Sequence, residues 1–305
     1  MRTKPNNIEF YVSNPYVFSG FVKPFDKARF IVIGIPFDKT STYRPGSRFA
    51  PLSIREASLN IETYNLFFRI DLEDLGVHDA GDLHIVESLE ETLNRISLVV
   101  KDIAKLGKIP VLIGGEHTIT YGATSAFEKD VGILCFDAHA DLRDEYMGEK
   151  ISHATFMRRI VERIGAEKLM LIGLRAISRE EAKFLQETNI SYVTSEDLKL
   201  LGFEKAFEII ELKMKNFDKV YLSIDMDVLD PAFAPAVGNP ESNGIDNHTM
   251  LKLIRKLCNE KVVGVDLTEV VPNYDTGITS VLSARILFEA LCALEKSRDR
   301  IKLGL

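Results

Sequence analysis

Short runs of apolar residues alternate with longer amphipathic segments along the whole chain. Residues 30–36 are almost uniformly apolar, which is typical of a strand covered on both faces. Residues 87–106 instead carry apolar side chains at helical spacing, and Gly107 is a natural residue to end a helix. We expect strands at 30–36, 75–82, 109–113, 131–136, 169–172, 191–193, 220–224 and 262–267. We expect helices beginning near residue 51 and after residue 246, and at 87–106, 154–164, 178–188, 204–214 and 279–295.

The order of these elements predicts the fold. Strict alternation of strand and helix is typical of a parallel sheet with helices packed on both faces. No linker, repeat or compositional break divides the chain, so we expect one domain over residues 1–305. Its fold should be a three-layer α/β/α arrangement around a single, mostly parallel sheet of about eight strands. An eight-fold barrel has the same order of elements and is the alternative. In either fold, ligands gather at the carboxyl ends of the strands.

Composition narrows the classes of partner. The chain has 305 residues and a net charge of −7, so nothing suggests binding to nucleic acid or to an anionic membrane. No apolar segment follows the N-terminus and no apolar run is long enough to span a bilayer. The cysteines lie far apart without a Cys-x-x-Cys pair, which predicts buried thiols in a reducing compartment. We therefore expect a cytoplasmic protein.

The clearest chemical signal follows the predicted strand at 131–136. Asp137, His139 and Asp141 stand at alternate positions directly after it. Side chains alternate between the two faces of extended backbone, so these three should point to the same side. A single Asp or His in a turn has no such meaning, but three potential ligands in this pattern indicate a metal site.

Other predicted strands end in residues of the same kind. His117 follows the strand at 109–113, Asp225 and Asp227 follow the strand at 220–224, and Glu269 follows the strand at 262–267. Together with the first motif, the chain offers two imidazoles and four aspartates at one edge of the sheet. This is too many ligands for one tetrahedral zinc ion and suits two metals that share carboxylates. Oxygen-rich ligands without a thiolate favour Mn²⁺, with Zn²⁺, Co²⁺ and Fe²⁺ as alternatives.

These motifs resemble the signatures of the ureohydrolase family, which comprises arginases, agmatinases and their relatives. The resemblance rests on residues 114–117 (GGEH), 137–141 (DAHAD) and 223–231 (SIDMDVLDP), and it extends from residue 43 to residue 272. Residues 141–146 (DLRDEY) and 152–155 (SHAT) make the chain most similar to agmatinases. The resemblance implies the three-layer fold, two Mn²⁺ ions per subunit and a homo-oligomer, either a trimer or a hexamer.

The resemblance also implies a role for each site residue. It assigns His117, Asp137, Asp141 and Asp225 to one metal, and His139, Asp137, Asp225 and Asp227 to the other. Agmatine would be hydrolysed to putrescine and urea when a metal-bridging hydroxide attacks the guanidinium carbon. Asp141 would orient that hydroxide, Glu269 would bind the guanidinium group, and His153 would carry a proton to the leaving amine.

The tail of the substrate should be read by the residues just beyond Asp141. An ammonium tail, as in agmatine, is favoured if Asp144 or Glu145 faces the pocket, and a carboxylate tail is favoured if Arg143 does. We expect Arg143 and Asp144 to contact substrate and agmatine to be preferred. Residues 236–244 depart from the family pattern in a loop at the expected mouth, which leaves arginase, guanidinobutyrase and formimidoylglutamase activities as alternatives.

Two further alternatives lie outside this assignment. A zinc amidohydrolase resembling the deacetylases would carry a His-His pair, which this chain does not have. An inactive metal-binding scaffold would keep the metal ligands without turnover, although His153 and Glu269 are both present. A urea-release assay separates that scaffold from an enzyme.

Overall fold

A single large sheet organises the chain in the computed structural model, which describes residues 6–13, 16–21, 23–127 and 131–302. In spatial order its strands are β1 (Val12–Ser13), β5 (Val77–Leu83), β2 (Phe30–Gly34), β6 (Ile109–Ile113), β11 (Val262–Thr268), β10 (Lys219–Asp225), β7 (Val131–Phe136), β8 (Leu169–Leu174) and β9 (Ser191–Thr194). Only the short β1 runs antiparallel to its neighbour, and all other neighbouring strands are parallel. The predicted fold class is confirmed. The barrel alternative is wrong, because the sheet is open, with β1 and β9 at its edges.

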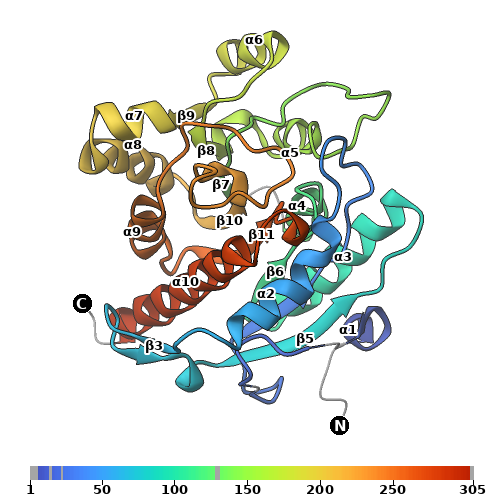
Figure 1. The fold of residues 1–305 in the computed structure, drawn as a ribbon, viewed down its shortest axis with the longest axis vertical. Coiled ribbons are helices and arrows are strands. Elements are labelled where there is room, and N and C mark those ends of the chain that lie inside the picture. Colours follow the sequence, from blue (N-terminus) through green and yellow to red (C-terminus); the bar gives the residue numbers. More distant parts are fainter. Residues whose placement is uncertain (1–5, 14–15, 22, 128–130, 303–305) are drawn as a thin grey trace.

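Helices cover both faces of this sheet (Figure 1). The helices are α1 (Asn6–Tyr11), α2 (Ala50–Ser58), α3 (Leu89–Lys105), α4 (Ile119–Thr124), α5 (Phe156–Ile164), α6 (Arg179–Thr188), α7 (Ser195–Leu200), α8 (Phe203–Lys215), α9 (Asn247–Leu257) and α10 (Ile278–Lys302). One apolar core lies under α2 and α7–α10, and a second lies under α1 and α3–α6. Phe30 and Val32 of β2 belong to the first core, whereas Ile31 and Ile33 belong to the second. A strand with a core on each side must be apolar at every position, which is the pattern of the sequence.

Local signals place the helix ends where the sequence predicts them. Ser88 caps α3 by accepting a hydrogen bond from the Glu91 N–H, and Gly107 follows the helix with a positive φ of 68°. Asp246 caps α9 in the same way, through the Thr249 N–H. The sequence prediction misses α1, α4, α7, β1 and the small hairpin of β3 (Tyr64–Asn65) and β4 (Ile70–Asp71). These elements are too short to show a clear periodicity.

Two further expectations concern membrane-spanning segments and the number of domains. Among the residues described, no helix combines the length and the apolar character needed to cross a membrane. The predicted single domain, residues 1–305, includes positions outside the described residues and stays a prediction.

A buried ion pair joins α2 to β5. The Arg55 side chain is fully buried, and its Nε and Nη2 donate to the two carboxylate oxygens of Asp79 at 2.8 and 2.9 Å. Asp82 takes a further bond from Nη1, and the Gly81 carbonyl accepts from Nη2 at 3.0 Å. Each nitrogen of the Arg55 guanidinium therefore donates to an acceptor. Shortening the Arg55 side chain would leave these acceptors without their donor.

We expect Arg55→Ala to lower the free energy of unfolding by about 3–5 kcal/mol, because it leaves the carboxylate of Asp79 buried without its cation. Arg29→Ala is the matched control, since Arg29 pairs with Glu295 where both side chains are partly exposed, and it should cost about 1 kcal/mol or less. Denaturant unfolding of both variants measures the difference. Equal, small losses would show that the buried pair adds nothing beyond a surface pair.

Candidate metal centre and active site

The predicted site residues meet at the carboxyl edge of the four central strands. β6, β11, β10 and β7 are neighbours in the sheet, and each is followed by one of the motifs. A cavity of about 480 Å³ opens at this edge. Its lining includes the predicted residues His117, His139, Asp141, Arg143, His153, Asp225, Asp227 and Glu269. Chain positions more than 150 residues apart are therefore brought to one place by strand order.

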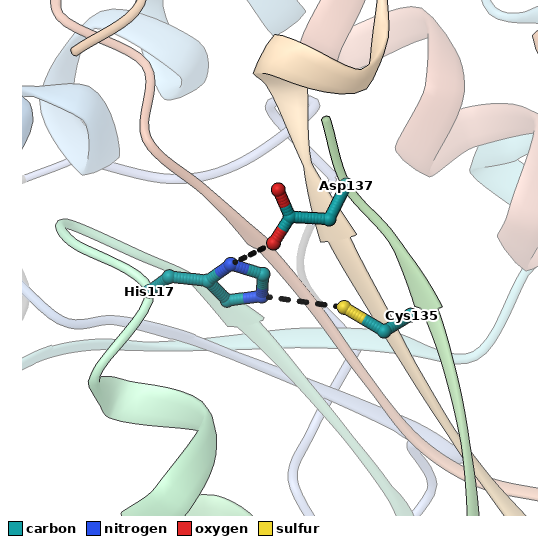
Figure 2. Close-up of side chains that lie close together, drawn as sticks. All are labelled: His117, Cys135 and Asp137. Atoms are coloured by element: carbon teal, nitrogen blue, oxygen red, sulfur yellow. Dashed lines mark hydrogen bonds and ion pairs between the residues drawn. The ribbon is translucent and has the colours of Figure 1, made fainter. Parts of the chain in front are cut away.

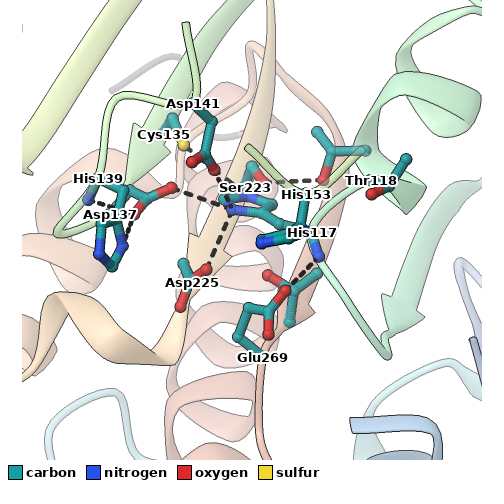
Figure 3. A network of polar contacts seen from close by, with 12 residues as sticks. His117, Thr118, Cys135, Asp137, His139, Asp141, His153, Ser223, Asp225 and Glu269 are labelled. Atoms are coloured by element: carbon teal, nitrogen blue, oxygen red, sulfur yellow. Dashed lines mark hydrogen bonds and ion pairs between the residues drawn. The ribbon is translucent and has the colours of Figure 1, made fainter. Parts of the chain in front are cut away.

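The six predicted metal ligands form one cluster, most of whose members are shown in Figure 3. His117 Nδ1 lies 3.0 Å from Asp137 Oδ2, 3.1 Å from Asp225 Oδ2 and 3.7 Å from Asp141 Oδ2. His139 Nδ1 lies 2.9 Å from Asp227 Oδ2 and 3.6 Å from Asp137 Oδ1. The carboxylate of Asp137 thus stands between the two imidazoles, one oxygen toward each.

The convergence is as predicted, but extended backbone is only part of its cause. β7 ends at Phe136, and the His139 N–H donates to Asp137 Oδ1 at 2.6 Å. Asp141 has a positive φ of 52°, in the left-handed region that is uncommon for a residue other than glycine. The turn therefore directs Asp141 into the cluster, and such strain is often found at functional sites.

A hydrogen-bond chain fixes the proton of His117. The Ser223 hydroxyl donates to Asp266 Oδ1 at 2.6 Å, and His117 Nε2 lies 2.8 Å from the same hydroxyl oxygen. Because Ser223 uses its proton on Asp266, Nε2 of a neutral His117 must be the donor. Nδ1 then presents a lone pair, has no hydrogen-bond partner of its own and faces carboxylates. A cation bound between Nδ1 and the carboxylates would remove the repulsion between their lone pairs.

The pKa values of two of the aspartates also reflect the clustering of negative charge. Burial, and then the charges of Asp227 and Asp137, raise the pKa of Asp225 well above its usual range. Burial and the charge of Asp137 do the same to the pKa of Asp141. Divalent cations reverse this effect, so the donor set of oxygens and imidazole nitrogens fits such metals.

Cys135 lies near this cluster but on the other side of the His117 ring. Figure 2 shows its sulfur at the Nε2 edge and Asp137 at the Nδ1 edge, and Sγ is 3.9 Å from Nε2. A metal held at Nδ1 would not reach this sulfur. Burial also raises the pKa of the Cys135 thiol, so the thiol stays protonated. This agrees with the expectation of a buried, inert cysteine.

Glu269 and His153 occupy the same cavity. Glu269 has a positive φ of 64°, and its Oε1 accepts a hydrogen bond from the His117 N–H at 2.7 Å. Burial, and then the neighbouring Glu116, raise the pKa of Glu269 to about 8. A β-carbon added at Gly238 would lie 2.9 Å from Glu269 Oε2, so a larger residue there would require the carboxylate to shift. Both residues are therefore placed where a substrate in the cavity would meet them.

The two residues expected to contact the substrate tail differ in whether they line the cavity. Arg143 lines the cavity, with Nε 3.9 Å from Glu181 Oε2 and its guanidinium 5.3 Å from the centre of the Tyr146 ring. Asp144 does not line the cavity, and its carboxylate pairs with Arg159 at 2.6 Å, so nothing in the structure supports its expected contact with the substrate. Glu145 does not line it either. A local pattern could not show that an arginine one turn into α5 captures Asp144.

The carboxylates at the mouth are Glu181 and Glu241 instead, and the sequence analysis misses both. Glu181 looks like part of a capping box for α6, and it does accept from the Ser178 N–H. Glu241 lies in the atypical loop, where its Oε1 is 3.8 Å from His139 Nε2. The unusual sequence of that loop could have drawn attention to Glu241. For Glu181, the sequence indicates only a place in the cap of α6.

Arg175 holds the atypical loop in place, and it also had no sequence signal. Its guanidinium donates to the backbone carbonyls of Asp227 at 2.6 Å, Glu241 at 2.8 Å and Ser242 at 3.0 Å. These bonds tie the mouth of the cavity to the turn that carries a metal ligand. With its donors used on carbonyls, Arg175 offers little to a carboxylate in the cavity.

Comparison with known proteins places the chain in a family. A model of the arginase family matches residues 28–293. The chain is 42% identical over 273 residues to an uncharacterized protein of Methanothermus fervidus, covering 88% of this chain and 93% of the relative. It is 35% identical over 264 residues to an agmatinase of Pyrococcus horikoshii, covering 86% of this chain and 90% of the relative. The structure of agmatine ureohydrolase of Thermoplasma volcanium matches it with a TM-score of 0.88 at 39% identity, over 97% of this chain and 99% of that one.

The chain therefore belongs to the arginase family. The resemblance to ureohydrolases is confirmed, and so is the assignment of the chain as an enzyme, an amidinohydrolase of that family. The family match also removes the deacetylase-like alternative. The roles of the individual site residues, the metal and the substrate are matters for proposal.

Proposed function

We propose that this enzyme hydrolyses agmatine to putrescine and urea at a centre of two Mn²⁺ ions. The observation that carries the proposal is the enclosure of metal-type ligands, Glu269 and His153 in one cavity. His117, Asp137, Asp141 and Asp225 would hold one metal, and His139, Asp137, Asp225 and Asp227 would hold the other. Carboxylate-rich, thiolate-free ligands suit Mn²⁺. When bound, two divalent cations lower the pKa of a water that they share, which supplies a nucleophile at neutral pH.

The residues of the chain orient the substrate. Glu269 offers a planar carboxylate to the planar N–H groups of a guanidinium, a match that can form paired hydrogen bonds. An isolated Glu269 has a raised pKa of about 8, but a bound guanidinium favours its charged form. Asp141, which faces the same cavity, can accept a proton from the attacking water.

His153 is suited to move a proton to the departing amine. Burial, and then the charge of His139, lower the pKa of His153 to about 4, so its imidazole is neutral at pH 7. A neutral imidazole can accept a proton in the cavity. The protonated imidazole has a low pKa, so it readily passes the proton to the more basic amine.

The cavity mouth favours a cationic tail through Glu241. The Glu241 side chain is 46% exposed, and its one ion-pair contact among the described residues is His139 Nε2 at 3.8 Å. The Arg175 guanidinium also interacts with its charge, but its N–H groups are bonded to backbone carbonyls, so the carboxylate is open to an ammonium group. Glu181 also lines the cavity, but it is buried and its carboxylate already accepts from Leu142 and Ser178. Arg143 is the observation that favours a carboxylate tail, as in guanidinobutyrate, but its charge is partly offset by Glu181. Agmatine is therefore our first candidate and a guanidino acid our second.

We expect kcat/KM for agmatine to exceed that for arginine and for guanidinobutyrate by at least tenfold, or about 1.4 kcal/mol. Urea release with Mn²⁺ supplied, measured for each compound and in competition, tests this. Glu241→Gln should shrink the preference for agmatine by roughly two- to fivefold, as expected for a partly exposed ion pair. Glu145→Gln is the matched control outside the cavity. A higher kcat/KM for arginine or guanidinobutyrate would overturn the choice of substrate.

Assembly and location complete the proposal. We propose a homo-oligomer, a trimer or a hexamer, that acts in the cytoplasm. The three cysteines support a reducing compartment, since all are unpaired and buried. Sedimentation of the Mn²⁺-loaded protein measures the assembly.

A further inference from the structure

The His153 ring lies between two hydroxyl groups of a loop that precedes it by more than a hundred residues. Thr40 Oγ1 is 3.3 Å from His153 Nδ1, and Thr42 Oγ1 is 3.4 Å from His153 Nε2. The backbone N–H of His153 also donates to Thr40 Oγ1, at 2.9 Å. Thr40 therefore contacts both the backbone and the ring of His153.

The direction of the Thr40 hydroxyl is decided by a third residue, Glu116. Thr40 Oγ1 lies 2.6 Å from Glu116 Oε1, and a carboxylate can only accept. The single hydroxyl proton of Thr40 therefore points to Glu116. Its lone pairs are left to accept from His153, which requires the proton of a neutral His153 ring to sit on Nδ1. The other ring nitrogen, Nε2, which lies 3.4 Å from Thr42 Oγ1, is then unprotonated and can accept a proton in the cavity.

Glu116 is itself held firmly. It is completely buried, and it accepts from the Thr40 N–H at 2.7 Å, the Ser41 N–H at 3.1 Å and the Thr118 hydroxyl at 2.6 Å in addition to the Thr40 hydroxyl. With the longer bond from the Ser41 hydroxyl at 3.4 Å, five donors satisfy a carboxylate that pairs with no cation among the described residues. These bonds clamp residues 40–41 to the turn after β6, so the position of Thr40 follows from Glu116.

We propose that Glu116 and Thr40 are positioning residues for His153. Glu116 orients the Thr40 hydroxyl, and this hydroxyl fixes the tautomer and the ring orientation of His153 so that Nε2 faces the substrate. The inference rests on the proposed function only for the use of that proton. The tautomer itself can be observed without turnover.

The first experiment compares Thr40→Val with Thr40→Ser. Valine keeps the shape of threonine but has no hydroxyl, so we expect kcat to fall roughly 10- to 100-fold with KM and metal content unchanged. Serine should restore kcat to within about threefold of the wild type, because its hydroxyl can make the same bonds. Ser41→Ala is the matched control, since the Ser41 hydroxyl donates the longest bond to the same carboxylate, at 3.4 Å, and has no hydrogen bond to His153 in the described part of the chain.

Coupling to His153 separates positioning from general stability. In a His153→Ala background, Thr40→Val should lower kcat no further, because the group that it positions is absent. An equal loss in both backgrounds would overturn the proposal, as would a full kcat in Thr40→Val. Glu116→Gln should also lower kcat without loss of metal, because its amide nitrogen cannot accept the hydrogen bonds that one of the two carboxylate oxygens accepts.

The second experiment reads the tautomer directly. In protein labelled with ¹⁵N-histidine and loaded with diamagnetic Zn²⁺, long-range ¹H–¹⁵N spectra should show His153 protonated on Nδ1 in the wild type and largely on Nε2 in Thr40→Val. An Nε2–H tautomer in the wild type would overturn the proposal. If the tautomer depends on Thr40 but no guanidino compound is hydrolysed, the proposed function fails and the positioning role stands.

Discussion

Asp225→Ala is expected to lose both metals and to lower kcat by about 10³-fold or more. Asp225 Oδ2 lies 3.1 Å from His117 Nδ1, in the first ligand group. Its Oδ1 accepts from the Asp227 N–H at 2.8 Å and so shapes the turn that presents a ligand of the second group. One substitution would therefore remove a carboxylate that we propose both metals share, and would loosen Asp227. Losing about 4 kcal/mol of transition-state stabilisation corresponds to 10³-fold in rate.

Elemental analysis and urea release on the same samples measure this effect. The wild type purified with Mn²⁺ should hold close to two metals per chain, and Asp225→Ala should hold well under one. Asp230→Asn is the control, because Asp230 follows the same strand but its carboxylate accepts from the backbone N–H groups of Ala232 and Gly244 and lies outside the cluster of predicted ligands. An active wild-type enzyme with a single tightly bound Zn²⁺ would contradict the two-metal centre.

His153→Ala should lower kcat by roughly 10²- to 10⁴-fold, the usual contribution of a positioned proton-transfer group. Metal content should be unchanged, since no metal ligand contacts the His153 side chain through a hydrogen bond in the described part of the chain. His248→Ala is the matched control, because His248 is an exposed histidine in the first turn of α9. An unaltered kcat in His153→Ala would reassign this residue to a structural role in its loop.

These two variants also address the alternative of an inactive scaffold. A scaffold would bind metal in the wild type and lose it in Asp225→Ala, but it would release no urea from any guanidino compound. An enzyme shows both the metal loss and the loss of turnover. His153→Ala separates the two properties within one protein, because it should reduce turnover while the metals stay.

The sequence alone determined the layered sheet and the metal-type ligands. A strand covered on both faces must be apolar throughout, so apolar runs such as 131–136 are enough to identify the central strands. Parallel strands end at the same edge, so the residues that follow them must gather. Alternation of strand and helix and the chemistry of Asp, Glu and His were therefore sufficient to place His117, Asp137, Asp225 and Glu269 at one edge. That their strands are neighbours follows from the strand order of the sheet, which only the structure shows. The left-handed turn at Asp141 could not be predicted in this way, but Asp141 still lies in the cluster, as expected.

Only the tertiary structure decided which residues line the mouth and orient His153. Asp144 was expected to face the substrate, but Arg159 in α5 holds it outside the cavity. Glu241 is placed by the backbone bonds of Arg175, and Thr40 by the buried carboxylate of Glu116. The contacts of Glu241 and Thr40 join loop segments that are 66 and 76 residues apart, and loops carry no periodicity that predicts their path. Their positions depend on long-range hydrogen bonds that exist only after the sheet has formed.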